Sequence, residues 1–313
     1  MAVKSNAVFN HVLTKTASEF AVNEAEYAAP ALAPVFPAAV QAATFPVWLR
    51  ENMLTVPDLK ARAPGAPYER LDMEIGNDTF ATRDYGAEVA LDDRQKAIYA
   101  SAFDADRGKI QRGTRVLMLN KERRIHALVT GAGVPTSTPG TKWDQANADP
   151  IGDVDTVKEV IHDNCGMDPN VMVIPRDVFN ILKELPVILD KIKYTQRGVI
   201  TPELLAPIFG VSKIVIAGAV QNSAADGQAL SIAKVWADSI VLAYVNSAID
   251  IESPTFARTF AWNGYTKAGR GEIGVKTYRD DNANSAIHQL MHDVDEKLAA
   301  AACGYHLSDV LAA

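Results

Sequence analysis

The pattern of apolar and polar positions predicts one long helix near residues 106–131. Leu117 and Ile125 recur at helical spacing on one face, and Asp104 or Asp106 can cap the start. The opposite face is basic. Glu122 is the one acid among its cations, which are Arg107, Lys109, Arg112, Arg115, Lys121, Arg123 and Arg124.

Residues 150–313 read as alternating strands and helices. Thr201 followed by Pro202 predicts a helix start, and Gly210 a helix end. A further helix is expected from Pro175 to Pro186, and another over Ile287–Ala302. The expected strands are Asn170–Ile174, Lys213–Ala217, Leu230–Trp236, Ser239–Val245, Thr255–Trp262 and Glu272–Asp280.

Residues 42–90 predict strands joined by a long loop. Prolines and glycine in Arg62–Pro67 indicate irregular chain. Apolar residues then alternate with acids over Leu71–Ile75, and Gly76–Asp78 has the composition of a turn. We therefore expect a hairpin over Leu71–Asp84.

Residues 1–41 predict an arm, and the uncharged stretch that continues to Leu49 does not predict a membrane anchor. Residues 28–49 carry no charge and are long enough to span a bilayer, but they contain Pro30, Pro34, Pro37 and Pro46. Each interior proline costs a helix about 3 kcal/mol. Polar residues interrupt residues 1–20 at spacings that exclude a signal peptide. Extended chain lying on another surface, in a soluble cytoplasmic protein, is the expectation.

Composition and charge narrow the function classes. The 313 residues are 48% hydrophobic and 22% charged, as in ordinary globular proteins, with a net charge of −7. Proteins that wrap nucleic acid usually carry a basic excess, so an acidic chain is not expected to grip DNA. Cys165 and Cys303 lie far apart in sequence and are expected to be buried free thiols rather than a disulfide.

Several short motifs resemble metal-binding, phosphate-binding or catalytic sites, but the residues around each motif do not support that function. His288 and His292 could share one helix face and a metal ion, but Gln289 stands where a zinc protease needs glutamate. Gly131–Gly133 follows a helix and lacks the lysine of a phosphate loop. Acid pairs such as Asp92–Asp93 and Asp280–Asp281 fall at turns or helix starts. We predict no catalytic, cofactor-binding or metal-binding residue and no cofactor.

The basic helix face admits two interpretations. It could be a solvated surface with modest pairing inside one chain, each exposed pair being worth about 0–1 kcal/mol. Alternatively, it could complement acids on a neighbouring subunit. The nearest acidic stretch in sequence comprises Asp153, Asp155, Glu159, Asp163 and Asp168.

The order of segments resembles the major capsid proteins of tailed bacteriophages, whose fold is named after phage Hong Kong 97. The resemblance covers nearly the whole chain. Its stretches, read in order, are Arg62–Gly65, Tyr85–Asp93, Leu119–Ile125, Thr141–Asp144, Asp168–Pro175, Thr201–Ile216 and Ser253–Phe260.

The resemblance implies an α+β fold with four parts. These would be an N-terminal arm (residues 1–41), an extended β-hairpin loop (42–85), a peripheral domain with a long spine helix (86–163 and 245–290), and an axial α/β domain (164–244 and 291–313). The arm would lace onto neighbouring subunits, and the extended loop would reach over one of them.

The implied function is a structural one without enzymatic activity. The chain would self-assemble as a homo-oligomer of capsomer rings into an icosahedral shell that encloses double-stranded DNA without reading its sequence. Scaffolding, portal and decoration proteins would be its partners. It would be part of the virion, assembled in the host cytoplasm away from membranes. The alternatives are an encapsulin-like nanocompartment shell and a soluble α/β enzyme with an unrecognised site.

Overall fold

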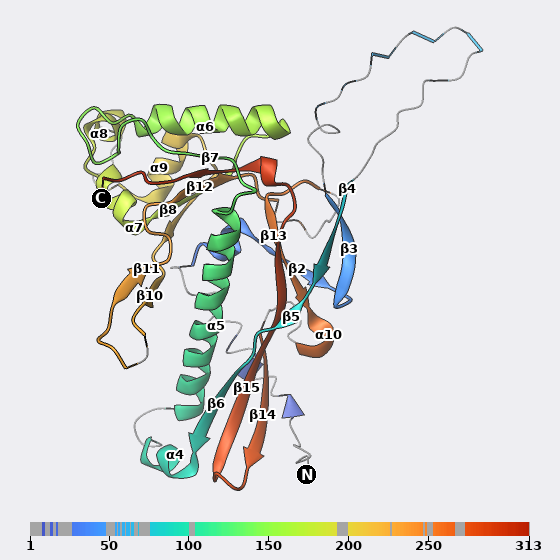
Figure 1. Cartoon of the computed structure of the whole chain (residues 1–313), viewed down its shortest axis with the longest axis vertical. Coiled ribbons are helices and arrows are strands. Elements are labelled where there is room, and N and C mark those ends of the chain that lie inside the picture. The colour runs from blue at the N-terminus through green and yellow to red at the C-terminus, as the bar shows by residue number, and fades with distance from the viewer. Residues whose placement is uncertain are drawn as a thin grey trace.

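The computed structural model consists of two β-sheets linked by one long helix (Figure 1). Apart from a few isolated residues, the structure describes residues 27–47, 76–99, 104–192, 200–225, 227–246, 253–266 and 273–312. Most of the residues between the two strands of the expected loop, and most of the first 26, lie outside these ranges.

The long sheet has seven strands within the described residues. Its centre is β15 (Ser285–Leu298), which pairs antiparallel with β14 (Ile273–Asp280) and β13 (Ala257–Trp262). The path β1-β14-β15-β13-β2 runs from β1 (Val8–Phe9) to β2 (Val35–Ala38). The strands β5 (Arg83–Asp84) and β6 (Ala87–Asp92) also pair with β15.

The compact sheet has five strands in the described part of the chain, in the order β7-β16-β12-β8-β9. Their bounds are Thr136–Ser137, Gly304–Leu307, Ile240–Ala243, Val171–Pro175 and Lys213–Ala217. The strands β8 and β12 are buried along their whole length, as expected for the centre of a sheet covered on both faces.

Short helices surround the compact sheet. They are α6 (Pro150–Cys165), α7 (Arg176–Leu182), α8 (Pro186–Ile192) and α9 (Pro202–Phe209). The helix α6 contacts α9, β16 and the 3-10 turn η1 (Ala301–Cys303). Two smaller helices, α4 (Asp93–Tyr99) and α10 (Asn263–Thr266), border the long sheet.

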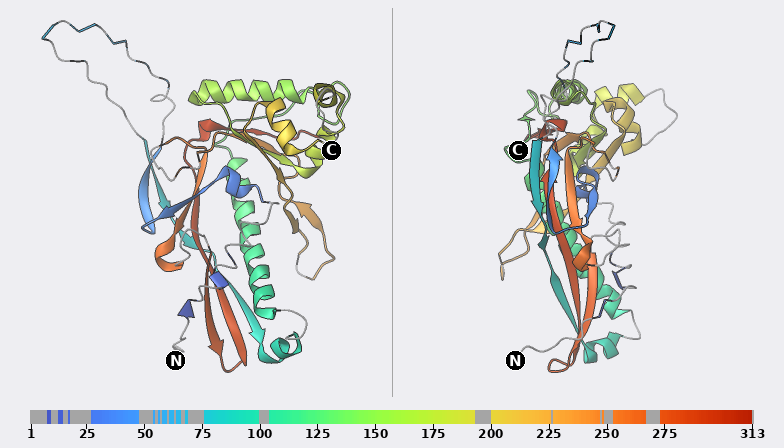
Figure 2. Two further views of the ribbon diagram at one scale, coloured as in Figure 1. Left: turned by 180° about the vertical axis from the view of Figure 1, so that it is seen from behind. Right: turned by 90° about the vertical axis from the view of Figure 1, so that its right-hand side faces the viewer.

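Two two-stranded units extend from this body. The strands β3 (Ala42–Val47) and β4 (Gly76–Ala81) pair antiparallel and form the stem of the extended loop. The strands β10 (Val220–Asn222) and β11 (Ile232–Lys234) form a separate ribbon. Figure 2 shows the stem and the ribbon on opposite sides of the molecule.

The predicted long helix is confirmed as α5 (Ala105–Val129). The Asp104 side chain accepts a hydrogen bond from the Arg107 amide, so the expected cap forms. Gly113 faces β15, and a Cβ at this position would lie 2.8 Å from Cδ1 of Leu290. The missing side chain lets α5 approach β15 closely. Leu117 and Ile125 are buried, as their spacing predicts.

The helix predicted over Ile287–Ala302 is wrong, because Ser285–Leu298 forms the strand β15. Leu, Met, Glu, Lys and Ala favour helices in isolation, so composition pointed to a helix. In the fold, the segment lies between partners on both edges and gains backbone hydrogen bonds along its length. Position in the sheet outweighs the intrinsic preference.

The turn predicted at Gly76–Asp78 is also wrong. These residues belong to β4, and their partner is β3 rather than the segment Leu71–Ile75, which lies outside the described residues. The hairpin therefore closes over a much longer connection. The Gly-Asn-Asp composition resembles a turn, but these three residues pair with Phe45–Val47 of β3.

Several local predictions are confirmed. The strand β9 has its predicted bounds, and α9 begins at Pro202 after Thr201 and ends at Gly210, whose φ of 66° is the left-handed conformation glycine favours. The helix expected from Pro175 to Pro186 is shorter in the structure, where α7 ends at Leu182, and Pro186 is the first residue of α8. Both cysteines are buried free thiols.

Candidate functional site

The two histidines of the sequence analysis do not form a metal site. They lie on the strand β15 and not on a helix, four residues apart, which places their backbones about 13 Å from one another. His288 is engaged with its neighbours: its Nε2 lies 2.9 Å from Oδ1 of Asp106 and its Nδ1 lies 3.1 Å from Oγ1 of Thr277. The described residues contain no group of three or more His, Cys, Asp or Glu suited to a metal ion.

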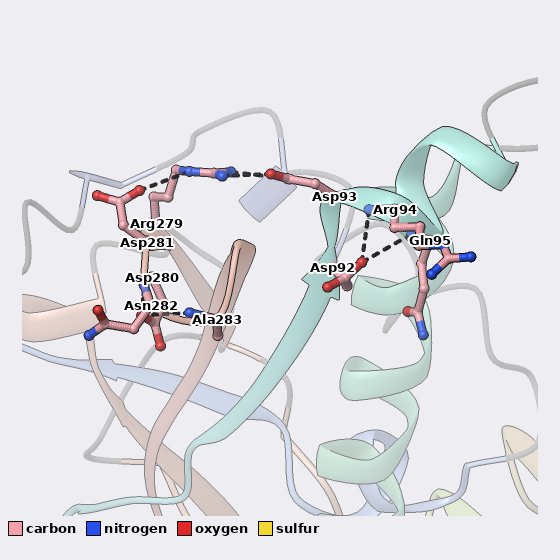
Figure 3. A network of polar contacts seen from close by, with 9 residues as sticks. All are labelled: Asp92, Asp93, Arg94, Gln95, Arg279, Asp280, Asp281, Asn282 and Ala283. Atoms are coloured by element: carbon pink, nitrogen blue, oxygen red, sulfur yellow. Dashed lines mark hydrogen bonds and ion pairs between the residues drawn. The ribbon is translucent and has the colours of Figure 1, made fainter.

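The acid pairs have structural partners, as Figure 3 shows at the tip of the long sheet. The Asp92 carboxylate accepts from the amides of Arg94 and Gln95 at the start of α4. Asp280 accepts from two amides of the turn that follows β14. Asp93 and Asp281 both bind the guanidinium of Arg279. These carboxylates cap turns and pair with a cation, so they form no acid–base pair.

The clearest polar site joins three distant parts of the chain. Glu122 on α5 is fully buried. Its Oε1 accepts hydrogen bonds from the Ala28 amide at 2.8 Å and from Nε1 of Trp236 at 2.5 Å, while Oε2 accepts from the Ala29 amide at 2.9 Å. Burial raises the pKa of this carboxyl, against the effect of the three hydrogen bonds.

This Glu122 site fixes the N-terminal segment. The two amides belong to the first turn of α2 (Ala29–Leu32), where free N–H groups need acceptors. Sequence reasoning placed Glu122 and Lys121 on an exposed basic face, and that expectation is wrong, because both side chains are buried. A single acid inside a run of cations was the signal that could have identified the site.

An aromatic cluster holds the base of the extended loop. Phe45 of β3 and Phe80 of β4 pack on Phe260 of β13, and the rings of Phe80 and Phe260 stack 4.3 Å apart and nearly parallel. Phe36 of β2 meets Phe260 edge to face. Such pairs add about 0.5–1.5 kcal/mol beyond burial. The cluster therefore sets the direction in which the stem leaves the long sheet.

A second contact ties α5 to the residues that follow the stem. Arg124 donates two hydrogen bonds to the carboxylate of Glu296, at 3.0 and 2.7 Å. Its guanidinium also lies 3.9 Å from the centre of the Tyr85 ring. Arg124, like the buried Lys121, is therefore an expected surface cation that lies within the subunit.

The exposed cations of α5 keep a surface of their own. Arg112, Arg115 and Arg123 are exposed, and none forms an ion pair with the described residues. Three members of the acidic stretch bind locally instead. Asp155 pairs with Lys158, Asp168 contacts His162, and Asp153 accepts from Nε1 of Trp143. We name Arg112, Arg115 and Arg123 the arginine stripe.

Two histidines, the half-buried His126 and the buried His306, lie where α5 meets the compact sheet. The ring of His126 stands edge-on to Trp236, with centroids 5.0 Å apart. His306 of β16 contacts Oγ1 of Thr136 through Nδ1. Burial lowers the pKa of both histidines, and the proximity of His306 lowers the pKa of His126 further. The Nε2 atoms of both lack hydrogen-bond partners among the described residues.

Because of these two histidines, we expect the free energy of unfolding of the free subunit to fall in mild acid. Their pKa lies below the ordinary 6.5 in the folded state, so the unfolded chain binds more protons as the pH falls through about 6.5. Each can lower the free energy of unfolding by at most about 1.4 kcal/mol per pH unit. Urea unfolding between pH 7.5 and 5.5 measures the slope.

The matched variant for this experiment is His126→Gln combined with His306→Gln, which cannot take up the protons. Its stability should depend less steeply on pH than that of the wild type. Glu122, whose pKa is raised, contributes with the opposite sign in both proteins and cancels in the comparison. Equal slopes in the two proteins would contradict the assignment.

The sequence and the fold were compared with those of known proteins. No protein-family model matches the chain. The chain is 27% identical over 245 residues to the major capsid protein of Burkholderia phage BcepMu, covering 76% of each chain. It superimposes on a phage-related protein from Bordetella bronchiseptica with a TM-score of 0.75, at 23% identity, over 97% of this chain and 98% of that one. Both likenesses support a major capsid protein of a tailed phage.

Other capsids share the fold of this capsid subunit at lower identity. The mature capsid protein of bacteriophage PhiM1 matches with a TM-score of 0.53 at 12% identity, over 99% of this chain and 90% of that one. An encapsulin from Synechococcus elongatus matches with a TM-score of 0.50 at 11% identity, over 87% and 82% of the two chains. The α+β fold of Hong Kong 97 type expected from the sequence is confirmed. The role of the subunit is structural, in an oligomeric shell that belongs to the virion.

No helix in the described part of the capsid subunit has the length and apolar character needed to cross a membrane. The uncharged segment that raised the question contains α2, β2 and β3, and it packs on α5 and on the long sheet. The expected extended chain is found in β2 and β3, whereas Pro30 lies in the short helix α2.

Proposed function

We propose that the subunit builds an icosahedral shell that encloses a double-stranded DNA genome, and that it has no enzymatic activity. The observation that carries the proposal is the combination of an anchored arm and a projecting loop stem on a capsid fold. The Glu122 carboxylate binds Ala28 and Ala29 of the arm, and the aromatic cluster sets the direction in which the stem leaves the long sheet. Contacts with neighbouring subunits would offset the entropy of ordering an arm and an extended loop.

The division into domains follows the sheets. We propose that the long sheet with α5 forms the peripheral domain, and that the compact sheet with α6, α7, α8 and α9 forms the axial domain around the capsomer axes. Residues 1–41 would be the arm and residues 42–85 the extended loop. Copies related by rotation would contact one another through different faces, which closes rings.

Scaffolding, portal and decoration proteins complete the proposed assembly, which would take place in the host cytoplasm. The wall facing the genome would hold DNA without reading its sequence, in keeping with the net charge of −7. The encapsulin-like alternative shares the fold but differs in content, since such a shell would hold cargo protein. A soluble enzyme would instead form a small, discrete oligomer with a pocket of perturbed ionisable groups.

The content of the particle tests the proposal. Particles would be purified from cells that produce the phage, treated with nuclease, and analysed for protected nucleic acid and for copurifying protein. Protected double-stranded DNA of genome length supports the proposal. Particles that hold a single abundant enzyme and no DNA would establish the nanocompartment instead.

We propose that the arginine stripe faces acidic groups of a neighbouring subunit. Guanidinium groups suit carboxylates because they can donate two parallel hydrogen bonds, and the chain carries 38 acids against 31 Lys and Arg. The double variant Arg112→Ala/Arg115→Ala should therefore need several-fold more protein for half-maximal assembly at low salt. The deficit should shrink in about 0.5 M salt, where the Debye length falls to a few ångströms.

Light scattering at increasing protein concentration measures this effect. The control removes two exposed lysines of the compact-sheet region, as Lys191→Ala/Lys213→Ala, and changes the net charge equally. Assembly of the arginine variant that is indistinguishable from wild type at low salt would show that the stripe is a solvated face.

A further inference from the structure

The two cysteines of the chain meet where α6 packs on the 3-10 turn η1. Cys165 is the last residue of α6, and Cys303 is the last residue of η1. The two elements are in contact, and the side chains of the two cysteines are hydrogen-bonded to each other. Cys165 is 2% exposed and Cys303 is fully buried. Two segments that are distant in the sequence therefore place a pair of thiols together in the core.

Hydrogen bonds fix the position of both thiols. The Cys303 amide donates to the Ala300 carbonyl at 3.0 Å, and the Cys303 carbonyl accepts from the amide of Tyr244, which follows β12, at 2.8 Å. On the other side, the Cys165 thiol donates to the Met167 carbonyl at 3.6 Å. The packing of a helix end on the compact sheet therefore sets the pairing of the two sulfur atoms.

The hydrogen bond between the two thiols makes them unequal. It lowers the pKa of the Cys165 thiol, against the effect of burial. The same bond, together with burial, raises the pKa of Cys303. Because a thiolate is the nucleophile in thiol oxidation, Cys165 is the sulfur that reacts first. Cys303 lies beside it, in the position of a resolving thiol.

The place of Cys165 in α6 gives a small oxidant a route to it. The last turn of a helix opens at a lower free-energy cost than its centre. The next residue, Gly166, is exposed and has a φ of 70°, so the chain leaves the helix directly after Cys165. Hydrogen peroxide is only slightly larger than water, and a brief opening of this turn is enough to admit it.

We propose that Cys165 and Cys303 form an oxidation site, at which a peroxide converts the two thiols into a disulfide within one subunit. The Cys165 thiolate attacks a peroxide oxygen, the O–O bond breaks, and the leaving hydroxide takes up a proton to become water. The Cys303 sulfur then attacks the sulfenic acid on Cys165 and loses its proton, and the hydroxyl group leaves as a second water. Two thiols and one hydrogen peroxide thus give one disulfide and two waters.

The disulfide would join the end of α6 to the start of β16. The loop that it closes contains β8, β9 and β12 of the compact sheet. A disulfide that closes a long loop stabilises a protein mainly by restricting the unfolded chain. Thiols stay reduced inside most cells and are oxidised outside them, so the link would form after the protein leaves a reducing cell interior.

Peroxide treatment of the reduced, folded, full-length chain tests the site. After the peroxide is removed, alkylation in denaturant should label no thiol instead of two, and the intact mass should fall by the mass of two hydrogen atoms. Proteolysis should release a peptide pair that joins Cys165 to Cys303 and separates on reduction. The midpoint of thermal unfolding should rise by about 5 °C or more, and dithiothreitol should reverse the rise.

Two single variants separate the roles of the sulfur atoms. Cys303→Ser keeps a hydroxyl donor beside Cys165 but cannot form the disulfide, so the sulfenic acid on Cys165 should persist and be trapped by dimedone. In Cys165→Ser, dimedone should not label Cys303. Neither variant should gain thermal stability on peroxide treatment. Circular dichroism spectra equal to that of the wild type establish that both variants fold.

The contrary outcomes are distinct. Two thiols that both remain free in the folded wild type after peroxide treatment would refute the site. A disulfide between two chains, or sulfinic acid on Cys165 without a cross-linked peptide, would refute the pairing with Cys303. An unchanged unfolding midpoint in a chain with the disulfide would refute its stabilising effect. The inference goes beyond the proposed function, and these measurements on the subunit leave that function to its own test.

Discussion

Replacing Glu122 with alanine is expected to lower the free energy of unfolding of the free subunit by about 3–5 kcal/mol. The carboxylate is the acceptor for three buried donors, two of them from the arm segment and one from Trp236 of the compact-sheet region. Its removal leaves all three without their acceptor. The arm should also become sensitive to protease near residue 28, because its attachment to α5 is lost.

Urea unfolding and limited proteolysis measure the two effects. The conservative variant Glu122→Gln should be intermediate, since it keeps one acceptor but turns an amide group toward the backbone donors. Glu159→Ala is the matched control, because Glu159 is an exposed acid on α6. A change below about 0.5 kcal/mol for Glu122→Ala, as expected for the control, would mean that the arm is held by other contacts.

The second large effect is expected from Gly304→Ala at the start of β16. A Cβ at this position would lie 2.2 Å from Cε2 of Phe256, whose ring is fully buried. The ring cannot move without displacing other core atoms, so the cost should reach about 3 kcal/mol, the upper end for overpacked cores. Thermal and urea unfolding of the free subunit measure it.

A double variant identifies the cause. Phe256→Leu shortens the clashing side chain, so Gly304→Ala/Phe256→Leu should be more stable than the sum of the single effects predicts. Gly140→Ala is the control, because no atom lies within 4 Å of a Cβ built there. Strict additivity of the two changes would show that the steric explanation is incorrect.

Periodic segments with clear punctuation were predictable from sequence. The helix α5 has an apolar face and a capping aspartate, and α9 has proline at its first position and glycine after its end. These features are local, so a single sequence contains them. The resemblance of segment order then identified the fold, which no individual motif could have done.

Tertiary context decided the segments that sequence reasoning misjudged. The strand β15 has helix-favouring residues and becomes a strand because partners lie along both of its edges. Glu122 lies in a basic run, and its partners in the arm and at Trp236 are 93 or more residues away in the chain. Charge patterns along a helix do not reveal which side meets a distant segment.

The most direct test of the central claim is the assembly state of the purified full-length chain. Sedimentation velocity over a range of protein concentrations, with electron microscopy of each species, measures it. The account predicts rings, closed shells, tubes or sheets, and a particle shape that depends on whether a scaffold is co-expressed. A uniform monomer or dimer at every concentration, with crowding agents and with scaffold present, would contradict it.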